Sequence, residues 1–334
     1  MSIEIVQPGF FATIQDLGRF GSQKYGVIVG GAMDSLSLRI ANVLVGNEEG
    51  EAALEVTMFG TELKFDKDCL IAITGGNMDP VIDGEKAPMW QPVFIQKGQV
   101  LKLKSLVSGY RAYIAVAGGI KVPEVMGSKS TYIRAKIGGY KGRELQRGDL
   151  IDCGDLTSGN RMIVEQAKAM NTPFSWSVHY ASFYTFKRSQ TIRILTGSEF
   201  DRFDSESQKT LVSEPYKLSV NADRMGYQLE GESLSLSEKF ELLSEGVTYG
   251  TIQVPSNGQP IILMADRQTT GGYPKIGQVI SADLPRLAQM QPGNKIQFEI
   301  VSIDKAERLL IQQELDFHEL KLGIQFKMQR NRGK

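Results

Sequence analysis

The stretch GTIQVPSNGQPIILMADRQTTGGYPKIGQVISADL, residues 250–284, shows how this chain is built. Ile261–Met264 is a short run of large apolar residues, which is typical of a buried β-strand. Charged and polar residues follow at once, and then Gly271-Gly272, a pair that favours a turn. This stretch therefore predicts a β-rich protein in which a charged loop emerges from a buried strand.

Short runs rich in Val, Ile, Tyr and Phe recur along the chain, each ended by Gly, Asn or Asp. Many strands with few helices must close or stack to cover their edges. The sequence therefore predicts a mainly β fold of two barrels or sandwiches. The other predicted strands include Thr61–Phe65, Cys69–Thr74, Val100–Lys104, Tyr110–Val116, Thr191–Leu195 and Lys295–Ile300.

Three helical segments are predicted. One begins after Asp34 as its N-cap and runs over Ser35–Val45, with apolar residues on one face and a glycine as its stop. A second, short helix follows Asp283. The third covers residues 302 to about 320 and is amphipathic, so we expect it to pack on the surface.

The length of 334 residues exceeds that of one usual domain and favours two cores. We place the boundary in the irregular segment 161–188, which mixes a helical-looking piece with Asn171-Thr172-Pro173 and an aromatic cluster. The predicted organisation is an N-terminal β-barrel domain with one early helix over 1–188, a C-terminal β-barrel domain over 189–301, and a terminal helix and tail over 302–334.

The composition argues against several classes of function. Basic and acidic residues number 38 each, so no net field favours nucleic acid or an anionic membrane. The N-terminus lacks the pattern of a secretory signal, and no apolar run is long enough to span a bilayer. Cys69 and Cys153 lack CxxC spacing, and His179 and His318 are far apart, which disfavours a metal site or a His-based triad. We expect a cytoplasmic protein with inert thiols.

The loop after Ile261–Met264 holds the densest set of reactive groups. Asp266 could hold or deprotonate a substrate, and Arg267 could pair with a carboxylate or phosphate through two hydrogen bonds. Lys275 adds a mobile positive charge, and the glycines allow backbone N–H groups to approach an anion. The alternative is a purely structural turn in which Asp266 caps backbone groups and Arg267 covers a barrel end.

Other clusters have the same two interpretations. Asp223-Arg224 is either a second part of the site or a local ion pair beside a turn. The segment Gln15–Arg19 lies before the first helix, where an anion site or simple helix capping are both consistent with the residues. Arg111 and Arg143 are additional basic candidates that fit equally well as salt-bridge partners.

Several long motifs, in this order, resemble the biotin-dependent carboxyltransferase or allophanate hydrolase subunit 2 family, which includes the C subunit of prokaryotic 5-oxoprolinase. They are PGFFATIQDLGRFG, GGAMDSLSLRIANVLVGN, AVAGGI, GSKST, DRMGY, SEGVTYGTIQVPSNGQPIILMADRQTTGGYPKIG and ISADL, which span roughly residues 8 to 284.

The resemblance implies tandem cyclophilin-like β-barrels without peptidyl-prolyl isomerase activity. It implies a hetero-oligomer with a subunit 1 (B) protein and with the A subunit of 5-oxoprolinase. The implied reaction is the ATP-dependent opening of 5-oxo-L-proline to L-glutamate, with ATP bound by the complex. This chain lacks a carboxylase domain and a Met-Lys-Met biotinylation motif, so no biotin is expected on it.

In this interpretation Arg267, Lys275 and Arg224 would stabilise anionic oxygens, and Asp266 would orient substrate or water. We therefore predict Asp266, Arg267 and Lys275 as catalytic residues, with no metal. The predicted substrate-binding residues are Gln253, Gln268, Thr269, Thr270, Gly271, Gly272, Tyr273, Asp223, Arg224 and Arg111.

Two other functions are compatible with the same family. Some relatives antagonise an inhibitor of a sporulation kinase by binding the subunit 1 partner, which would make this chain a regulatory protein. The urea carboxylase relatives accept a carboxyl group from biotin, which would make it a carboxyltransferase component. The density of ionisable groups near Asp266 favours an enzyme over a pure binding module.

Overall fold

The computed structural model describes residues 1–170, 174–238 and 242–330. These residues form two compact units. Unit 1 contains Met1–Arg19, Asp34–Tyr184 and the end of the chain from Leu315, and unit 2 contains Phe20–Met33 and Thr185–Glu314. The sequence-based ranges 1–188, 189–301 and 302–334 differ from these units because an early segment groups with unit 2 and the terminal helix is divided. Residues 331–334 lie outside the described residues.

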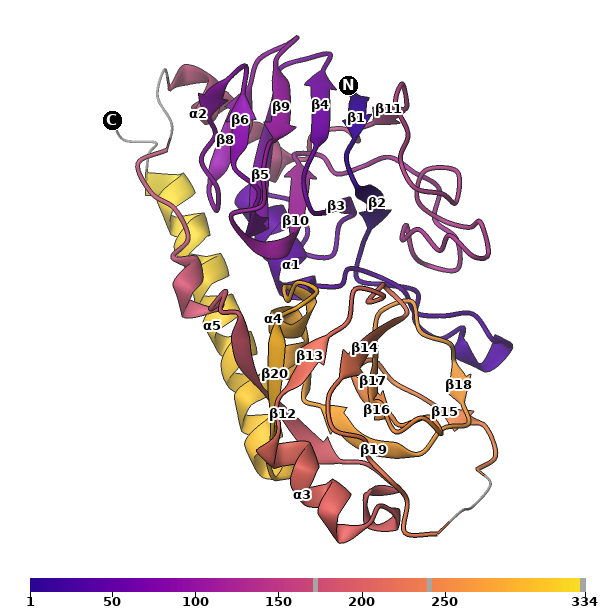
Figure 1. Cartoon of the computed structure of the whole chain (residues 1–334). Helices are drawn as coiled ribbons and strands as arrows, with labels where there is room; N and C mark the ends of the chain where they lie inside the picture. Colours follow the sequence, from indigo (N-terminus) through magenta and orange to yellow (C-terminus); the bar gives the residue numbers. More distant parts are fainter. Residues whose placement is uncertain (171–173, 239–241, 331–334) are drawn as a thin grey trace. The chain divides into compact units, whose positions relative to one another are not determined.

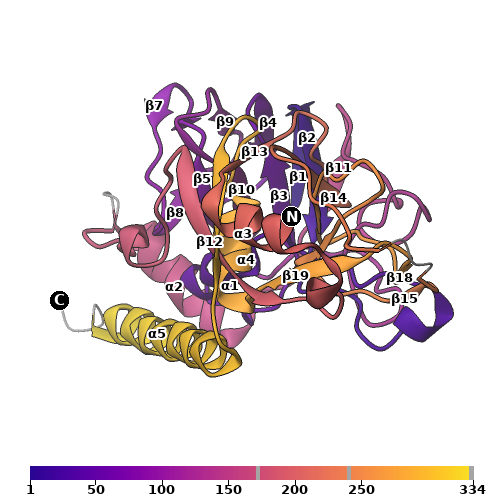
Figure 2. The ribbon, with the colours of Figure 1, turned by 60° about the horizontal axis from the view of Figure 1, so that its bottom comes forward.

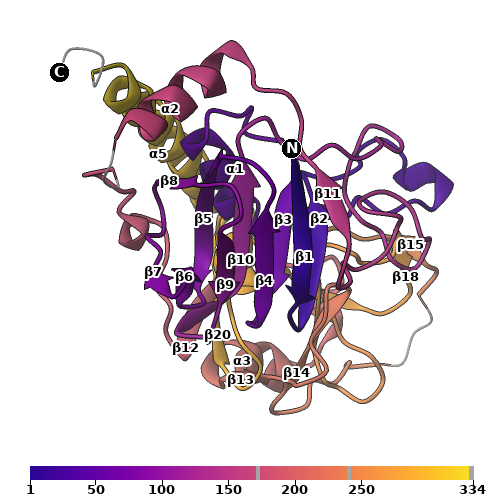
Figure 3. The same ribbon diagram turned by 90° about the horizontal axis from the view of Figure 1, so that it is seen from above.

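Unit 1 contains two antiparallel sheets (Figure 3). In strand order, the first consists of β11 (Leu150–Asp152), β1 (Ser2–Pro8), β4 (Thr61–Phe65), β9 (Val100–Leu103), β6 (Pro80–Ile82) and β7 (Glu85–Lys86). The second consists of β2 (Phe11–Gln15), β3 (Ala53–Thr57), β10 (Ser108–Val116), β5 (Cys69–Asn77) and β8 (Pro92–Ile95).

The core of unit 1 lies between these two sheets. Side chains such as Ile5 and Phe65 from the first sheet and Ile73 and Ile114 from the second are completely buried in one apolar cluster. The central strands β5 and β10 are buried along almost their whole length, because helix α1 (Ser35–Leu44) lies against them. This explains why their sequences are continuously apolar and do not alternate.

Unit 2 is built around a closed β-barrel (Figure 1). Its strands, in order around the barrel, are β12 (Ser189–Thr196), β19 (Lys275–Val279), β16 (Thr251–Gln253), β17 (Ile261–Leu263), β14 (Gly226–Glu230), β13 (Tyr216–Leu218) and β20 (Lys295–Ile300). A small separate sheet pairs β15 (Glu245–Gly246) with β18 (Thr270–Gly271).

The barrel closes through strands that are far apart in the sequence. Strand β12 pairs in parallel with β20 from Ser189↔Lys295 to Ile194↔Ile300, while the other pairs are antiparallel. Closure leaves no free strand edge in the barrel, and large side chains such as Tyr227 and Phe298 fill its interior.

The described residues form four further α-helices, namely α2 (Ser158–Ala169), α3 (Ser205–Ser213), α4 (Leu284–Ala288) and α5 (Ile303–Arg330). Figure 2 shows α5 as one continuous helix. Its first residues are counted with unit 2 and the rest with unit 1. None of the helices in the described part of the chain is both long and apolar enough to cross a membrane.

The predicted mainly β fold with a C-terminal helix is confirmed. The helix after Asp34 begins where predicted, and the Asp34 carboxylate accepts a hydrogen bond from the backbone N–H of Ser37 at 2.9 Å. The terminal helix is longer than predicted and continues past Gly323 to Arg330. The helical piece expected between residues 161 and 188 is helix α2, which begins a few residues earlier, at its capping box of Thr157 and Asn160.

Candidate functional site

The candidate site in unit 2 begins where strand β17 ends. The backbone N–H of Met264 donates to the carbonyl of Met225 at 2.9 Å, and that of Asp266 donates to the carbonyl of Arg224 at 2.7 Å. These bonds continue the pairing of β17 with β14 beyond the strand ends. They bring together the two Asp-Arg segments of the sequence, which are about forty residues apart.

Asp266 and Arg224 form a two-pronged ion pair. Arg224 Nε lies 2.9 Å from Asp266 Oδ2, and Arg224 Nη2 lies 2.8 Å from Asp266 Oδ1. Their side chains are only 8% and 12% exposed. A carboxylate fixed in this way is a structural support and a charged acceptor, so the geometry favours an orienting role over proton abstraction.

A glycine loop, residues 28–33, borders this ion pair. Arg224 Nη2 also donates to the carbonyl of Gly31 at 2.7 Å. Gly30 has a φ of +64°, and a Cβ there would lie 3.7 Å from Asp266 Oδ1. The loop backbone therefore approaches the ion pair closely, and its conformation favours glycine.

Arg267 is the most unusual charge of the site. Its side chain is buried, with 7% of the residue exposed, and its guanidinium has only long hydrogen bonds of 3.4–3.5 Å to carbonyl oxygens. No carboxylate in the described part of the chain forms an ion pair with it. Burial lowers the pKa of Arg267, although the nearby Tyr249 and Asp266 act in the opposite direction. A buried cation held this way is a ready partner for an anion.

Tyr249 is a site residue that the sequence reasoning missed. Its ring centre lies 6.0 Å from the guanidinium carbon of Arg267, and its hydroxyl donates to the carbonyl of Met33 at 2.8 Å. Tyr249 thus links Arg267 to the glycine loop. Its place in the motif SEGVTYG, just before β16, was a signal that could have identified it.

Lys275, predicted as catalytic, is held by two carboxylates. Its Nζ lies 2.7 Å from Glu245 Oε2 and 3.3 Å from Glu199 Oε2. Burial alone would lower the pKa of Lys275, but the hydrogen bonds and charges of Glu245 and Glu199 raise it above its ordinary value. Lys275 is therefore a firmly charged tether that joins β15 to the barrel.

Glu199 provides a pH-dependent contribution to stability. Burial acts to raise the pKa of Glu199, but the backbone N–H and the ammonium of Lys275 outweigh burial and lower it. A lowered pKa means that this stabilisation is complete above the ordinary value of 4.5 and is lost as the pH falls through the folded-state pKa. We expect Glu199→Gln to lower the free energy of unfolding by about 1–3 kcal/mol at pH 7. Urea unfolding should show that the difference from wild type shrinks below pH 4.5.

Gly271 and Gly272 allow chain segments to pack closely. A Cβ on Gly271 would lie 2.5 Å from Gln253 Nε2, and one on Gly272 would lie 3.3 Å from Ser244 Oγ. Gln253 is buried and donates to the carbonyl of Tyr273 at 3.3 Å. These contacts fix the predicted binding loop against β16 and against the segment that contains β15.

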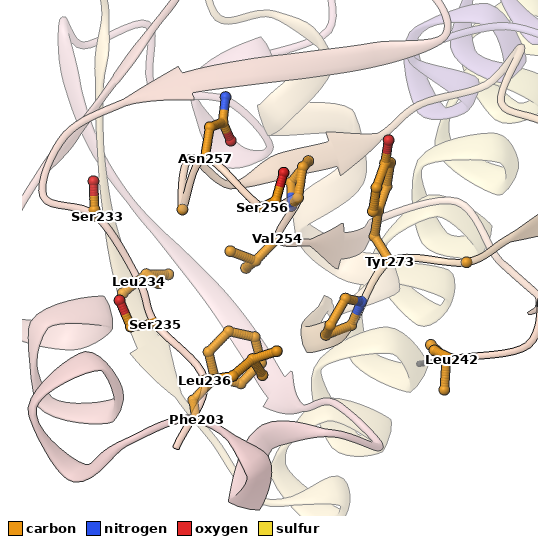
Figure 4. Close-up of a pocket in the computed structure, with 14 residues that line it drawn as sticks. Phe203, Ser233, Leu234, Ser235, Leu236, Leu242, Val254, Ser256, Asn257 and Tyr273 are labelled. Atoms are coloured by element: carbon orange, nitrogen blue, oxygen red, sulfur yellow. The ribbon is translucent and has the colours of Figure 1, made fainter. Parts of the chain in front are cut away.

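A cavity of about 1060 Å³ lies beside this loop (Figure 4). Phe203, Leu234 and Val254 form its buried apolar part, and Tyr273 stands at one side. Its lining residues are Phe203, Ser233–Leu236, Leu242, Val254–Gly258 and Gly272–Pro274. Two of the predicted substrate-binding residues, Gly272 and Tyr273, therefore line a cavity, whereas Asp266, Arg267 and Lys275 do not line it.

The remaining predicted residues are spread more widely. Asp223 is exposed, and its Oδ1 accepts hydrogen bonds from the backbone N–H groups of Met225 and Gly226. Asp223 therefore caps a turn. Gln268 and Thr270 are exposed, and Thr269 accepts a backbone hydrogen bond from Val247. Arg111 belongs to unit 1, where it is buried on β10 with its guanidinium carbon 5.0 Å from the Tyr110 ring centre.

The basic clusters of unit 1 have structural partners. Arg143 forms two hydrogen bonds with Asp149, at 2.7 and 2.8 Å. Asp16 accepts from the backbone N–H groups of Gly18 and Lys129 and from the hydroxyl of Ser128, so it organises the GSKST loop. In these two places the structural interpretation of the sequence fits the geometry.

The thiols have no reactive setting. Both cysteines are buried and free, and burial raises the pKa of Cys153 to about 12. Burial also raises the pKa of Cys69. Within the described residues, no group of three or more His, Cys, Asp or Glu side chains is placed to hold a metal ion.

The fold and this site define the class of protein. Residues 25–300 match the family described as carboxyltransferase domain, subdomain A and B. Because the match spans most of the 334 residues, the chain belongs to that family.

Within this class, the chain is similar to proteins named as the C subunit of 5-oxoprolinase. The one from Haemophilus influenzae is 39% identical over 313 residues, which cover 94% of this chain and 96% of that protein. The one from Escherichia coli is 39% identical over 318 residues, which cover 95% and 97%. A crystal structure of the K. lactis urea amidolyase has a TM-score of 0.83 and 26% identity, over 95% of this chain and 20% of the amidolyase.

Proposed function

We propose that this chain is the C subunit of an ATP-dependent 5-oxoprolinase, which opens 5-oxo-L-proline to L-glutamate together with the A and B subunits. The observation that carries the proposal is the similarity to two proteins named as that C subunit. In each comparison the similarity covers almost the whole length of this chain and of the matched protein. The complex would work in the cytoplasm, where the two buried cysteines stay reduced.

The charges around Asp266 suit this substrate. 5-Oxo-L-proline carries one carboxylate and a polar lactam group. Arg267 offers a buried guanidinium without a carboxylate partner among the described residues, which we propose binds the substrate carboxylate through two hydrogen bonds. The Arg224–Asp266 pair would hold the adjoining backbone in place while the lactam reacts.

The proposed reaction begins at the lactam oxygen, since an unstrained amide is a poor electrophile. Transfer of the γ-phosphoryl group of ATP to that oxygen forms an O–P bond and releases ADP. Water then adds to the ring carbon, and the C–N bond breaks with protonation of nitrogen, which gives an acyl phosphate. A second water releases phosphate and glutamate. We assign activation of the lactam to the B and C subunits and completion of hydrolysis to the A subunit.

ATP is proposed to contact another member of the complex. A triphosphate needs several positive charges or backbone donors. At the site described above, Arg224 and Lys275 are already neutralised by carboxylates, which leaves Arg267 as a single positive charge. One such charge matches one carboxylate better than it matches a triphosphate.

The test is glutamate release from 5-oxo-L-proline and ATP by the three purified proteins, with each omitted in turn. We expect glutamate and phosphate to form in equal amounts only when this chain is present. Full activity in its absence, or no activity with all three proteins present, would contradict the proposal.

A second candidate function is carboxyl transfer, which is favoured by the TM-score of 0.83 with the urea amidolyase structure. In this case the site would pass a carboxyl group from carboxybiotin on another chain to a small amide, and Arg267 would pair with the transferred carboxylate. Incubation with a biotin carrier whose carboxybiotin bears a labelled carboxyl group separates the two candidates, because only carboxyl transfer leaves the label in the product.

A further inference from the structure

Helix α5 has a line of large apolar side chains on a face that is exposed to solvent. We call this line the α5 seam. Its members are Ile311, Leu315, Leu322 and Phe326, which are 59%, 53%, 41% and 69% exposed. Large apolar side chains that gather on one exposed face are typical of a surface that another chain covers.

The seam is straight because of the spacing of its members along one continuous helix (Figure 2). Ile311 and Leu322 are eleven residues apart, and so are Leu315 and Phe326. A spacing of eleven residues stays close to one face of an α-helix. The relative positions of the four side chains therefore follow from the helix alone, and they extend over about 22 Å. A straight apolar line of this kind suits a second helix that lies along it.

Another face of α5 already packs against its own chain. Phe317, Ile324 and Met328 are at most 4% exposed, and they lie about 150° around the helix from the seam. Phe317 also contacts Arg39, whose guanidinium carbon lies 3.9 Å from the centre of the Phe317 ring. Since this face holds the helix in place, the apolar side chains of the seam are not needed for that purpose.

The charges along α5 favour a second copy of this chain as the occupant, in the opposite direction. Residues 311–319 contain three acidic residues and no Lys or Arg, whereas residues 320–330 contain three Lys or Arg and no acidic residue. Two antiparallel copies place the acidic part of one beside the basic part of the other, and parallel copies would place like charges together. Over residues 303–330 the five acidic and five basic residues cancel, which argues against a membrane surface, since that surface attracts basic helices.

The seam also matches itself in an antiparallel pair. A twofold axis between positions 318 and 319 places Leu315 of one copy at the same height as Leu322 of the other. The same axis places Ile311 opposite Phe326. Every member of the seam therefore has an apolar counterpart, as a twofold interface between identical surfaces requires.

We propose that two copies of this chain associate through the α5 seam as an antiparallel helix pair, with Leu315 packed on Leu322 and Ile311 packed on Phe326. Each copy buries four large side chains, so the interface is small and a Kd in the micromolar range is expected. The assembly has two candidate sites, one in each chain. The proposal does not depend on the reaction that the sites catalyse.

Sedimentation equilibrium of the full-length chain over a range of concentrations tests the association. The average mass of the wild type should rise with concentration from that of one chain, 36.9 kDa, towards twice that value. Leu315→Lys and Leu322→Glu each place a charge in the seam, and each should raise the Kd about tenfold or more. Both positions are exposed, so thermal unfolding of the variants should match that of the wild type.

The double variant Leu315→Lys, Leu322→Glu tests the direction of pairing. In the antiparallel pair the introduced ammonium of one copy lies opposite the introduced carboxylate of the other. The double variant should therefore recover much of the affinity that each single variant loses. In a parallel pair like charges would meet, so a double variant that associates more weakly than both single variants would overturn the antiparallel arrangement.

The matched control is Ile303→Glu. Ile303 is on the same helix and is 59% exposed, but it lies about 110° around the helix from the seam. We expect its Kd to stay within about twofold of the wild-type value. A wild type that stays monomeric at every concentration, or a dimer that the seam variants leave unchanged, would overturn the proposal. A monomeric wild type that binds a purified A or B subunit through the seam would also overturn it, because the seam would then belong to another protein.

Discussion

Replacing Arg267 by methionine is expected to abolish most of the activity and to leave the protein at least as stable as before. Two hydrogen bonds from a guanidinium to a carboxylate contribute about 3–6 kcal/mol, so kcat/KM for 5-oxo-L-proline should fall about a hundredfold to ten-thousandfold. In the free protein, Arg267 is a buried cation whose pKa is lowered by burial. Removing it relieves a desolvation cost, and the Tm should rise or stay unchanged.

The matched control is Arg193→Met, which removes an arginine whose charge is compensated. Arg193 Nε lies 3.0 Å from Asp283 Oδ2, and the Asp283 side chain is completely buried. This variant should lose about 3–5 kcal/mol of stability and keep the kcat/KM of its folded fraction. If Arg267→Met instead lowered the Tm and left kcat/KM unchanged, Arg267 would be a structural cover of the barrel end.

Asp266→Ala is expected to destabilise the protein strongly. It removes the carboxylate partner of Arg224, which stays buried and keeps its hydrogen bond to the carbonyl of Gly31. Breaking one side of a buried ion pair costs about 3–5 kcal/mol, which urea unfolding at pH 7 would measure. Activity should fall in parallel, because the backbone that carries Arg267 loses its support.

The double variant Arg224→Met, Asp266→Leu separates support from chemistry. Removing both charges should recover most of the stability, since apolar pairs of similar volume often replace buried ion pairs without loss. If Asp266 only positions Arg267, part of the activity should return with the stability. A stable double variant with no activity would show that the Asp266 carboxylate takes part in the reaction.

Local features of the fold were predictable because neighbouring residues determine them. The strand Thr61–Phe65 and the helix after Asp34 have the predicted bounds to within one residue, since apolar periodicity and an N-cap are both local signals. The parallel pairing of β12 with β20 was not predictable in this way. It depends on two segments about one hundred residues apart, and no short pattern specifies their register.

The site shows the same division. The sequence singled out Asp266, Arg267 and Arg224 by residue type, but their pairing depends on two barrel strands that lie side by side. Lys275 looked like a free positive charge because Glu199 and Glu245, its partners, are 76 and 30 residues away in the chain. A formal charge is visible in a sequence, whereas its neutralisation is a property of the fold.

The glycine loop of residues 28–33 has a consequence for biosynthesis. The carbonyl of Gly31 accepts its hydrogen bond from Arg224, 193 residues further along the chain. At about 5–20 residues per second, a ribosome needs roughly 10–40 s to reach that arginine after it has made the loop. During that time the loop has left the ribosome while most of the barrel strands do not yet exist. Unit 2 can therefore not fold from its N-terminal end as it is made, and a nascent chain stalled before Arg224 should leave Phe20–Met33 open to proteolysis.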